Sequence, residues 1–514
     1  MSITPRQLLP DLWLFQDICN VYVIKHDNTA IAIDFGSGAW LDCLPALGIE
    51  HIEHVFLTHH HADQCAGLQA RSQWPFVIHA PVGEEKFLDA EQQSHGTFQI
   101  LAKGCPDSYA ALQGGLPNVQ YDMAGFTDLF WGTLRVRFLH TPGHGRNACS
   151  AIVDMGSKQI AFCGDAAHDG GTIWQPYHLE WDHWTGAGAL EAWQGVMRLH
   201  GIHVDMLCPA HGPVITKQPR ALLAELRDKL LKLYHSKGQI SSDEKDDYVP
   251  AELMTCGARK LSSHLYQYGT NGYLLRSDNA EALIVDPFLP DMPLLEALLH
   301  ELGDVRLTAC TATHYHFDHC DAIPYLRAAY GTRAYLHPLV AEPLRDVSRM
   351  VVPWLPMASI VADEEWPVRG SWTWNEYRFK VAPWPGQTRW HCVFMAEIDG
   401  QKVVMGGDSF QPASRWNGTG GYCAYNGSRF REGFIPSANL MLRWQPDILC
   451  TGHGTYYRFH ASKFNKIIHW AESAEAAVKA LCPTGQLQKD YYLPRDRSNA
   501  QEQIRGAYYW SNAG

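Results

Sequence analysis

Two stretches of the chain, FLTHHHADQCAGL at 56–68 and TATHYHFDHCDAI at 311–323, contain the same polar cluster, Thr-His-x-His-x-Asp. The residue that follows the aspartate differs between them, being Gln64 in the first stretch and His319 in the second. A polar cluster that recurs at such a long interval indicates an internal duplication of whole domains, because solenoid repeats have much shorter periods.

The residues downstream of these stretches repeat with nearly constant spacing. Three polar residues recur in each copy. The first and second of them are 21 residues apart in both copies (165 − 144 and 408 − 387), and the second and third are 46 residues apart in the first copy and 45 in the second (211 − 165 and 453 − 408). The residues that define these gaps are His144, Asp165 and His211 in the first copy and Gln387, Asp408 and His453 in the second. The duplication therefore includes four separate polar elements in the same order.

The residues upstream repeat as well. NVYVIKHDNTAIAIDFG at 20–36 and NGYLLRSDNAEALIVDPF at 271–288 each contain two short apolar runs separated by Asp-Asn. Apolar runs on either side of a tight polar turn predict a β-hairpin, which here ends at Asp34 or Asp286.

Length and composition limit the class of protein. A chain of 514 residues is too long for one hydrophobic core, and 46% apolar with 19% charged residues is typical of a globular protein. The net charge of −12 argues against a nucleic-acid partner. We find no export signal, no apolar run of membrane-spanning length and no C-x-x-C pair among the 14 cysteines, which predicts a cytoplasmic protein with reduced thiols and no membrane contact.

The pattern of elements predicts an α/β fold with two tandem domains. Strand-like runs that end at the polar clusters alternate with helical stretches such as 187–199 and 294–302, and each half closes on a helix, near 218–234 and 461–481. The polar stretch SKGQISSDEKDDYVPA at 236–251 is typical of a linker. We therefore predict domains at 1–235 and 252–481, a linker at 236–251, and a C-terminal extension at 482–514 that packs on the outside.

The histidine and carboxylate clusters predict metal binding. Residues at i and i+2 lie on different faces of a helix, so an H-x-H-x-D cluster suits a tight loop, where the side chains can converge. Imidazole and carboxylate together bind metals such as zinc, iron or manganese. Satisfied loop histidines are the alternative, and the matching elements in both halves argue against it.

Both halves resemble the metallo-β-lactamase fold superfamily, in its hydrolase branch with glyoxalase II-like enzymes. The resemblance implies two αβ/βα sandwich domains, each with one or two metal ions at the edge of the sheets, zinc being the first choice and iron or manganese the alternatives. In the first half it implies a first metal position formed by His59, His61 and His144, and a second formed by Asp63 and His211, with Asp165 bridging. In the second half it implies His314 and His316 for one position and Asp318, His319 and His453 for the other, with Asp408 bridging.

Each half departs from the family pattern at one residue. Gln64 replaces a histidine of the second metal position in the first half, and Gln387 replaces the third histidine of the first position in the second half. An amide oxygen is a poorer zinc ligand than imidazole, so each half is weakened at a different position. His391 is a possible substitute ligand in the second half.

Aromatic loops follow both bridging aspartates. The first contains His168, His178 and His183 among tryptophans and tyrosine, and the second is SRWNGTGGYCAYNGSRF at 414–430. These loops either form the walls of a substrate site or pack between the domains.

The sequence predicts a metal-dependent hydrolase that uses a metal-bound hydroxide on a small ester, thioester or lactone. Asp63 and Asp318 would orient the nucleophile or accept its proton. The alternatives are an iron-dependent sulfur dioxygenase, which the family also contains and for which His59, His144 and Asp165 are the ligands, or a protein in which one domain is a structural or regulatory copy. The partner is a small-molecule substrate, and the oligomeric state stays open.

Overall fold

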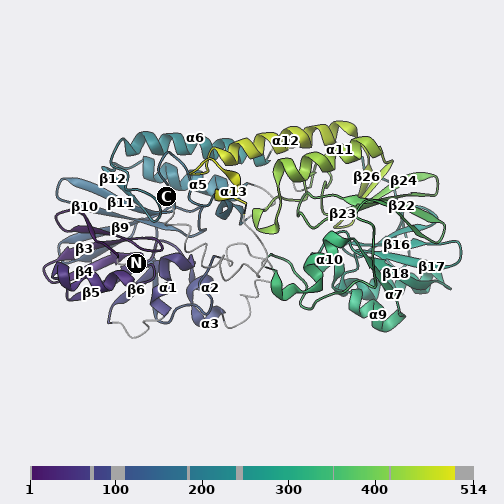
Figure 1. Ribbon diagram of the computed structural model, residues 1–514, viewed down its shortest axis with the longest axis horizontal. Helices are drawn as coiled ribbons and strands as arrows, with labels where there is room; N and C mark the ends of the chain where they lie inside the picture. Colours follow the sequence, from purple (N-terminus) through teal and green to yellow (C-terminus); the bar gives the residue numbers. More distant parts are fainter. Residues whose placement is uncertain are drawn as a thin grey trace.

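The computed structural model describes residues 3–69, 75–93, 110–181, 186–238, 247–350, 352–415 and 418–492. Figure 1 shows two α/β lobes, one formed by the first half of the chain and the other by the second half. The predicted α/β class and the two tandem domains are therefore confirmed. The residue limits of the domains stay a prediction.

Two sheets face each other in the first half. One has seven strands in the order β1-β2-β3-β4-β5-β6-β7, and the other has five in the order β12-β11-β10-β9-β8. Their facing sides pack through Phe56, Phe138 and Phe162, which belong to one buried cluster. The strands are β1 (Arg6–Leu9), β2 (Leu12–Gln16), β3 (Asn20–His26), β4 (Thr29–Ile33), β5 (His51–Phe56), β6 (Val77–Pro81), β7 (Val119–Met123), β8 (Asp128–Trp131), β9 (Leu134–His140), β10 (Cys149–Met155), β11 (Lys158–Gly164) and β12 (Met206–Pro209).

The second half repeats this pair of sheets. Its eight-stranded sheet runs in order from β13 to β20, and its six-stranded sheet from β21 to β26. The strands are β13 (Glu252–Leu253), β14 (Arg259–Lys260), β15 (Leu265–Tyr268), β16 (Gly272–Arg276), β17 (Glu281–Val285), β18 (Arg306–Thr311), β19 (Arg333–Leu336), β20 (Glu364–Glu365), β21 (Gly370–Trp374), β22 (Tyr377–Pro383), β23 (Cys392–Ile398), β24 (Gln401–Gly407), β25 (Ile448–Thr451) and β26 (Thr455–Arg458). The predicted hairpins are β3–β4 and β16–β17.

Helices pack on the outer faces of the sheets, as an αβ/βα sandwich requires. In the first half these are α1 (Ala62–Gln69), α2 (Glu85–Leu88), α3 (Ala90–Gln92), α5 (Ala187–His200) and α6 (Pro219–Gly238). In the second half they are α7 (Met292–Leu302), α8 (Phe317–Cys320), α9 (Ile323–Tyr330), α10 (Pro338–Arg345), α11 (Ile435–Trp444), α12 (Ala461–Lys479) and α13 (Leu487–Asp490). The helices predicted at 187–199 and 294–302 are α5 and α7. The two predicted closing helices are α6 and α12.

The two halves share one hydrophobic core. Leu226 and Leu230 of α6 belong to the same buried cluster as Ala471 and Ala474 of α12, and the two helices are in contact. Figure 1 shows both helices along the same edge of the molecule. Since burial of apolar surface is the main source of folding free energy, each half depends on the other for part of its stability.

The segments at the predicted boundaries differ in part from expectation. Helix α6 continues to Gly238, which lies inside the stretch predicted as a linker, and residues 239–246 of that stretch lie outside the described residues. Tyr491 of the C-terminal extension is fully buried, and its hydroxyl donates a hydrogen bond to Glu180 of the first half. The expectation that this extension packs on the outside is therefore wrong for Tyr491, while residues 493–514 lie outside the described part of the chain.

The ends of two central strands fix the loops that carry the histidine clusters. Asp34 and Asp286 directly follow β4 and β17 and have left-handed backbones, with φ of 58° and 53°. The carboxylate of Asp34 accepts a hydrogen bond of 2.8 Å from the backbone of Thr58, and that of Asp286 accepts one of 2.6 Å from Thr313. Each aspartate thus holds the residue immediately before the first histidine of a cluster.

Two expectations from composition concern the chain as a whole. No helix in the described ranges is both long and apolar enough to cross a lipid bilayer. The cysteines that the structure describes are all free thiols, and most of them are buried.

Candidate metal centres

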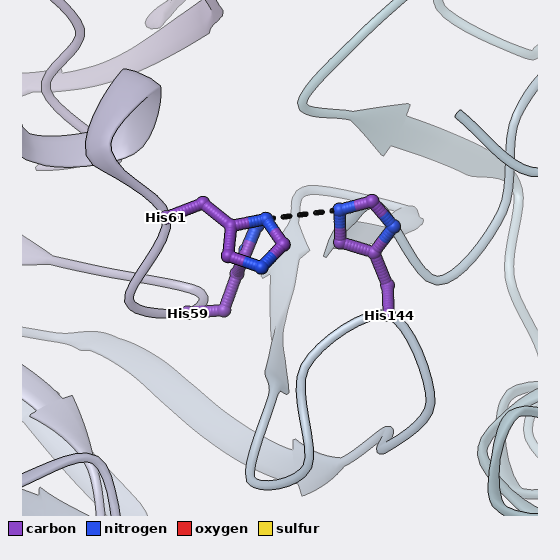
Figure 2. A group of neighbouring side chains, drawn as sticks. All are labelled: His59, His61 and His144. Atoms are coloured by element: carbon purple, nitrogen blue, oxygen red, sulfur yellow. Dashed lines mark hydrogen bonds between the residues drawn. The ribbon is translucent and has the colours of Figure 1, made fainter. Parts of the chain in front are cut away.

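Three histidines converge at the carboxyl ends of the strands in the first half. His59 and His61 follow β5, and His144 lies in the loop between β9 and β10. One nitrogen of each ring lies within 4.8 Å of the others, all three side chains are buried, and Figure 2 shows the rings facing one another. The Nε2 atom of His144 lies 3.1 Å from Nδ1 of His61. The structure thus brings together the three residues predicted for the first metal position.

The carboxylates predicted for the first half lie beside this group. Asp165 follows β11, and its Oδ2 atom lies 3.7 Å from Nε2 of His59 and 3.5 Å from Nε2 of His144. His211 follows β12 and lies between two carboxylates, with Nδ1 2.9 Å from Asp165 and Nε2 3.1 Å from Asp63. Asp165 is therefore placed between the histidine group and His211, as a bridging residue would be.

Burial and charge divide these histidines into two kinds. Burial lowers the pKa of His144 to about 3 and that of His61 well below its ordinary value, so both rings are neutral. Burial also acts on His211, but Asp165 and Asp63 overcome it and raise the pKa of that imidazole to about 10. The neutral rings have the lone pairs that a cation requires, while His211 without a cation is held as an imidazolium between carboxylates.

Gln64 lies where the second half has His319. Its side chain is fully buried, and neither its amide nitrogen nor its amide oxygen has a hydrogen-bond partner among the described residues. Asp34, the neighbouring strand-end carboxylate, is also buried, and desolvation raises its pKa to about 8. The side-chain amide of Gln64 is thus buried without partners, and burial keeps the neighbouring acid protonated at neutral pH.

The second half forms two overlapping groups. The first contains His314, His319 and Asp408, and the second contains Asp318, His319 and His453, with ligand atoms within 4.8 Å of one another in each. The Nε2 atom of His319 lies 3.2 Å from Oδ1 of Asp408 and 3.6 Å from Oδ2 of Asp318. Burial lowers the pKa of His319, but these carboxylates outweigh burial and raise it well above its ordinary value. His453 completes the group, with Nε2 3.2 Å from Asp408.

His316 is a predicted ligand that lies outside both groups of the second half. Its Nε2 atom is 3.1 Å from Oδ1 of Asn426, and that oxygen also accepts a hydrogen bond from the hydroxyl of Tyr315. The ring of His316 remains 4.4 Å from that of His314. The role of His316 as a ligand stays a prediction.

Gln387 and His391 contact two members of these groups, Asp408 and His314. The amide nitrogen of Gln387 donates a hydrogen bond of 3.0 Å to Oδ2 of Asp408, the predicted bridging residue, while Oδ1 of the same carboxylate has no hydrogen-bond partner among the described residues. His391 stacks on His314 with 4.8 Å between ring centroids, and burial lowers its pKa to about 3. Its Nε2 atom has no hydrogen-bond partner among the described residues, which keeps His391 available as a substitute ligand.

The residues present fit a metal ion in both halves. The Nε2 atoms of His59 and His314 are buried and have no hydrogen-bond partner within the described part of the chain. Buried polar atoms without partners are rare in folded proteins, and each needs an explanation. Imidazole nitrogens and carboxylate oxygens together are the donors that zinc, iron and manganese accept.

Several residues that support these groups have only weak signals in the sequence. Asn271 donates a hydrogen bond of 2.9 Å to the carboxylate of Asp318 and accepts one of 2.6 Å from the backbone of His453. In the first half Asn20 donates to the carbonyl of Gly212, next to His211. Each asparagine is the first residue of the repeated hairpin motif, and this repetition is the signal in the sequence that points to both residues. His60 forms a buried ion pair with Glu84, for which the sequence offers no signal, and its ring lies edge-on to that of His61 at 4.8 Å.

The aromatic loops lie at the interface of the halves and beside the first group. His178 packs on His61 and His144 with ring centroids 4.2 and 4.7 Å apart, and it contacts Tyr425 of the second half. Trp174 stacks on His211 at 4.6 Å. His168 contacts Thr172, whereas His183 lies outside the described residues. Of the two alternatives for these loops, packing between the domains is what the contact of His178 with Tyr425 shows, while the role as a wall of a substrate site stays a prediction.

Comparison with known families agrees with this architecture. A family model described as the metallo-beta-lactamase superfamily matches residues 14–211 and 265–467, which is one match in each half. The chain belongs to the metallo-β-lactamase superfamily.

Individual relatives match a part of the chain. A hydroxyacylglutathione hydrolase of Albidiferax ferrireducens is 30% identical over 27% of this chain and 48% of its own length. An atrochrysone carboxyl ACP thioesterase of Aspergillus chevalieri is 26% identical over 41% of this chain and 57% of its own length. A solved metallo-beta-lactamase of Cronobacter sakazakii, a HARLDQ motif mutant, is 17% identical with a TM-score of 0.33 and covers 45% of this chain and 96% of its own. The chain thus spans about half the length of the two curated relatives.

Proposed function

We propose that the protein is a metal-dependent hydrolase of a small ester, thioester or lactone, with zinc as the first choice of metal. The observation that carries this proposal is the convergence of three buried, neutral imidazoles, His59, His61 and His144, beside the carboxylate of Asp165. A divalent cation held by such a set lowers the pKa of water and polarises a carbonyl group.

The residues around this set have distinct roles in the proposal. His59, His61 and His144 hold the cation, and Asp165 neutralises its charge. Asp63 is the proton acceptor, because its side chain is 18% exposed and its carboxylate is held 3.1 Å from Nε2 of His211. In the second half the same roles fall to His314, His319 and Asp408, with Asp318 as the acceptor and His453 beside it.

The relatives support this class of substrate. One is named a hydrolase of hydroxyacylglutathione, and another is named a thioesterase. Hydrolysis of an acyl bond by a metal-activated water needs no serine or cysteine nucleophile. We therefore propose small acyl thioesters as the first substrates to test.

One observation favours a second candidate, an iron-dependent sulfur dioxygenase. Gln64 supplies no imidazole to the second metal position of the first half, which favours a single ion in the first position, where His59, His144 and Asp165 form a set of two histidines and one carboxylate. Two histidines and one carboxylate are typical of iron(II) oxygenases. A different observation favours the third alternative. Gln387 donates a hydrogen bond to Asp408 where the family has a histidine ligand, which favours a second half that acts as a structural or regulatory copy.

Metal analysis together with two activity assays tests these alternatives. The full chain, purified without chelators, is analysed for zinc, iron and manganese by mass spectrometry, and is assayed for thiol release from acyl thioesters and for oxygen uptake with persulfides. A variant with His59→Ala and His144→Ala should lose the part of thioester hydrolysis that the first centre supplies, whereas His51→Ala, at an exposed position of β5, should retain full activity. Iron in the first group with oxygen uptake and no hydrolysis would contradict the hydrolase proposal.

A further inference from the structure

The two candidate metal centres are joined by one short segment of the second half. The 3-10 turn η9 (Ala424–Asn426) contacts the 3-10 turn η5 (Pro176–Glu180) of the first half. The hydroxyl of Tyr425 lies 2.7 Å from Nδ1 of His178, and the backbone nitrogen of Ala424 donates a hydrogen bond of 2.6 Å to Glu180. Adjacent residues of this segment therefore face different metal centres.

The hydrogen bonds of His178 define its protonation. Its Nε2 atom lies 3.2 Å from the amide oxygen of Gln175, which can only accept, so Nε2 carries the proton. The Nδ1 lone pair then accepts the hydroxyl proton of Tyr425. Both ring nitrogens are thereby fixed, and the imidazole is held against the rings of His61 and His144.

The contact with Tyr425 is rigid because it is buried and anchored at several points. Tyr425 also packs edge-on against Tyr177, with 5.4 Å between ring centroids. Glu180, which accepts from Ala424, is itself buried and paired with Lys237 at 2.9 Å and with the hydroxyl of Tyr491. Four segments of the chain, from both halves, thus hold Tyr425 against His178.

Asn426 makes the corresponding contacts beside the ligand groups of the second half. Its amide oxygen accepts hydrogen bonds from Nε2 of His316 and from the hydroxyl of Tyr315. Its amide nitrogen donates to the carbonyl of Gln387, at 3.1 Å. The donor and acceptor pattern of this amide therefore fixes the ring of His316 beside His314.

We propose that residues 424–426 are a positioning element shared by both metal centres. Tyr425 orients His178 and, through it, the imidazoles of His61 and His144, so that the first centre is complete only when the second half is present. Asn426 orients His316, the predicted ligand whose ring lies beside His314 in the second half. This inference rests on the proposed binding of metal, because a positioning residue acts through the ligands that it orients.

Cobalt binding to the full chain tests the role of Tyr425. In a parent that carries His314→Ala and His319→Ala, bound Co²⁺ reports on the first centre alone through its visible absorption spectrum. Tyr425→Phe removes one hydroxyl, and we expect about tenfold weaker Co²⁺ binding together with a shifted visible band, as is typical when a partner of a metal ligand is lost. Tyr266→Phe is the matched control, because its hydroxyl donates to the backbone carbonyl of Ser263, away from the segment at 424–426.

A second variant shows whether the effect passes through His178. His178→Gln alone should weaken Co²⁺ binding to a similar extent, and adding Tyr425→Phe to it should have no further effect, since the two residues act as one unit. Unchanged affinity and spectrum in Tyr425→Phe, with normal binding by the parent, would overturn this inference and leave the proposed function intact. A parent that binds no Co²⁺ would overturn both.

Discussion

Nδ1 of His319 lies 3.1 Å from Oδ2 of Asp286, while Nε2 of the same ring lies 3.2 Å from Asp408. The imidazole therefore links the carboxylate at the end of β17 to the predicted bridging aspartate. In the first half the corresponding carboxylate is Asp34, but Gln64 replaces the histidine, and its side-chain amide makes no hydrogen bond to the described residues. The difference of one residue between the two motifs thus removes a connection between two buried acids.

The substitution Gln64→His should restore this connection. The new imidazole would donate to Asp34 and offer its other nitrogen to a cation beside Asp63 and His211, as His319 does in the second half. Imidazole is a better zinc ligand than an amide, so we expect the zinc content of the full chain to rise by about one ion.

Mass spectrometry on zinc-saturated protein after dialysis measures this change. Gln69→His, at the exposed end of the same helix α1, is the control and should leave the zinc content unchanged. If the wild-type first half already holds two tightly bound ions, the interpretation of Gln64 as a weakened ligand is wrong.

Asp165 and Asp408, the two predicted bridging aspartates, should each control their own centre. Asp165→Asn keeps the shape of the side chain but removes the charge that lies 3.5 and 3.7 Å from His144 and His59. We expect metal affinity of the first centre to fall by tenfold or more, on the order of the effect of losing a partner of a ligand. Competition with a chromophoric chelator measures this affinity in the full chain.

Asp408→Asn should have the equivalent effect on the second centre, and Asp154→Asn, at an exposed position of β10, should have none. Unchanged metal affinity in both Asp165→Asn and Asp408→Asn would indicate that these residues only form turns at the ends of β11 and β24.

The buried ion pair of His60 and Glu84 should contribute to stability and not to metal binding. Both side chains are fully buried, and the ring of His60 stacks on Phe87 at 4.1 Å. Removing one partner of a buried pair leaves an uncompensated polar group, so Glu84→Ala should lower the free energy of unfolding by about 3–5 kcal/mol. Urea denaturation measures the loss, and Glu50→Ala on the surface should change stability by less than about 0.5 kcal/mol. A loss of metal without a loss of stability would contradict this assignment.

Asp34 should make the metal-free protein less stable as pH rises. Burial raises the pKa of its carboxyl from 3.8 to about 8 in the folded state. Between these values the folded chain binds one more proton than the unfolded chain, so the free energy of unfolding decreases with increasing pH, by at most about 1.4 kcal/mol per pH unit.

Urea denaturation between about pH 5 and about pH 8 tests this dependence. Asp34→Asn should remove this part of the slope, because its amide does not titrate in this range. A slope that is the same in wild type and variant would show that Asp34 is ionised in the folded protein.

The fold and most of the centres could be predicted because their signals are local and occur twice. The hairpins that end at Asp34 and Asp286 are encoded by apolar runs around a polar turn, and the closing helices α6 and α12 by their periodicity. The histidines of each cluster are two residues apart, so their convergence follows from one loop.

The contacts that the sequence did not reveal join distant residues. Tyr425 and His178 are 247 positions apart, and Tyr491 and Glu180 are 311 apart. Nothing in the composition of either loop specifies such a partner, because it depends on how the two halves pack. The contact between His316 and Asn426 also joins residues that are far apart in the sequence, by 110 positions.

The common core beneath α6 and α12 has a genetic consequence. In a symmetric dimer of identical chains, every substitution appears in both subunits, so neither active centre can change alone. Here the two copies are encoded separately but fold against each other, and Gln64 could arise in one centre and Gln387 in the other. Covalent duplication thus gives this molecule a freedom that a homodimer lacks, namely independent inheritance of two centres within a single folded body.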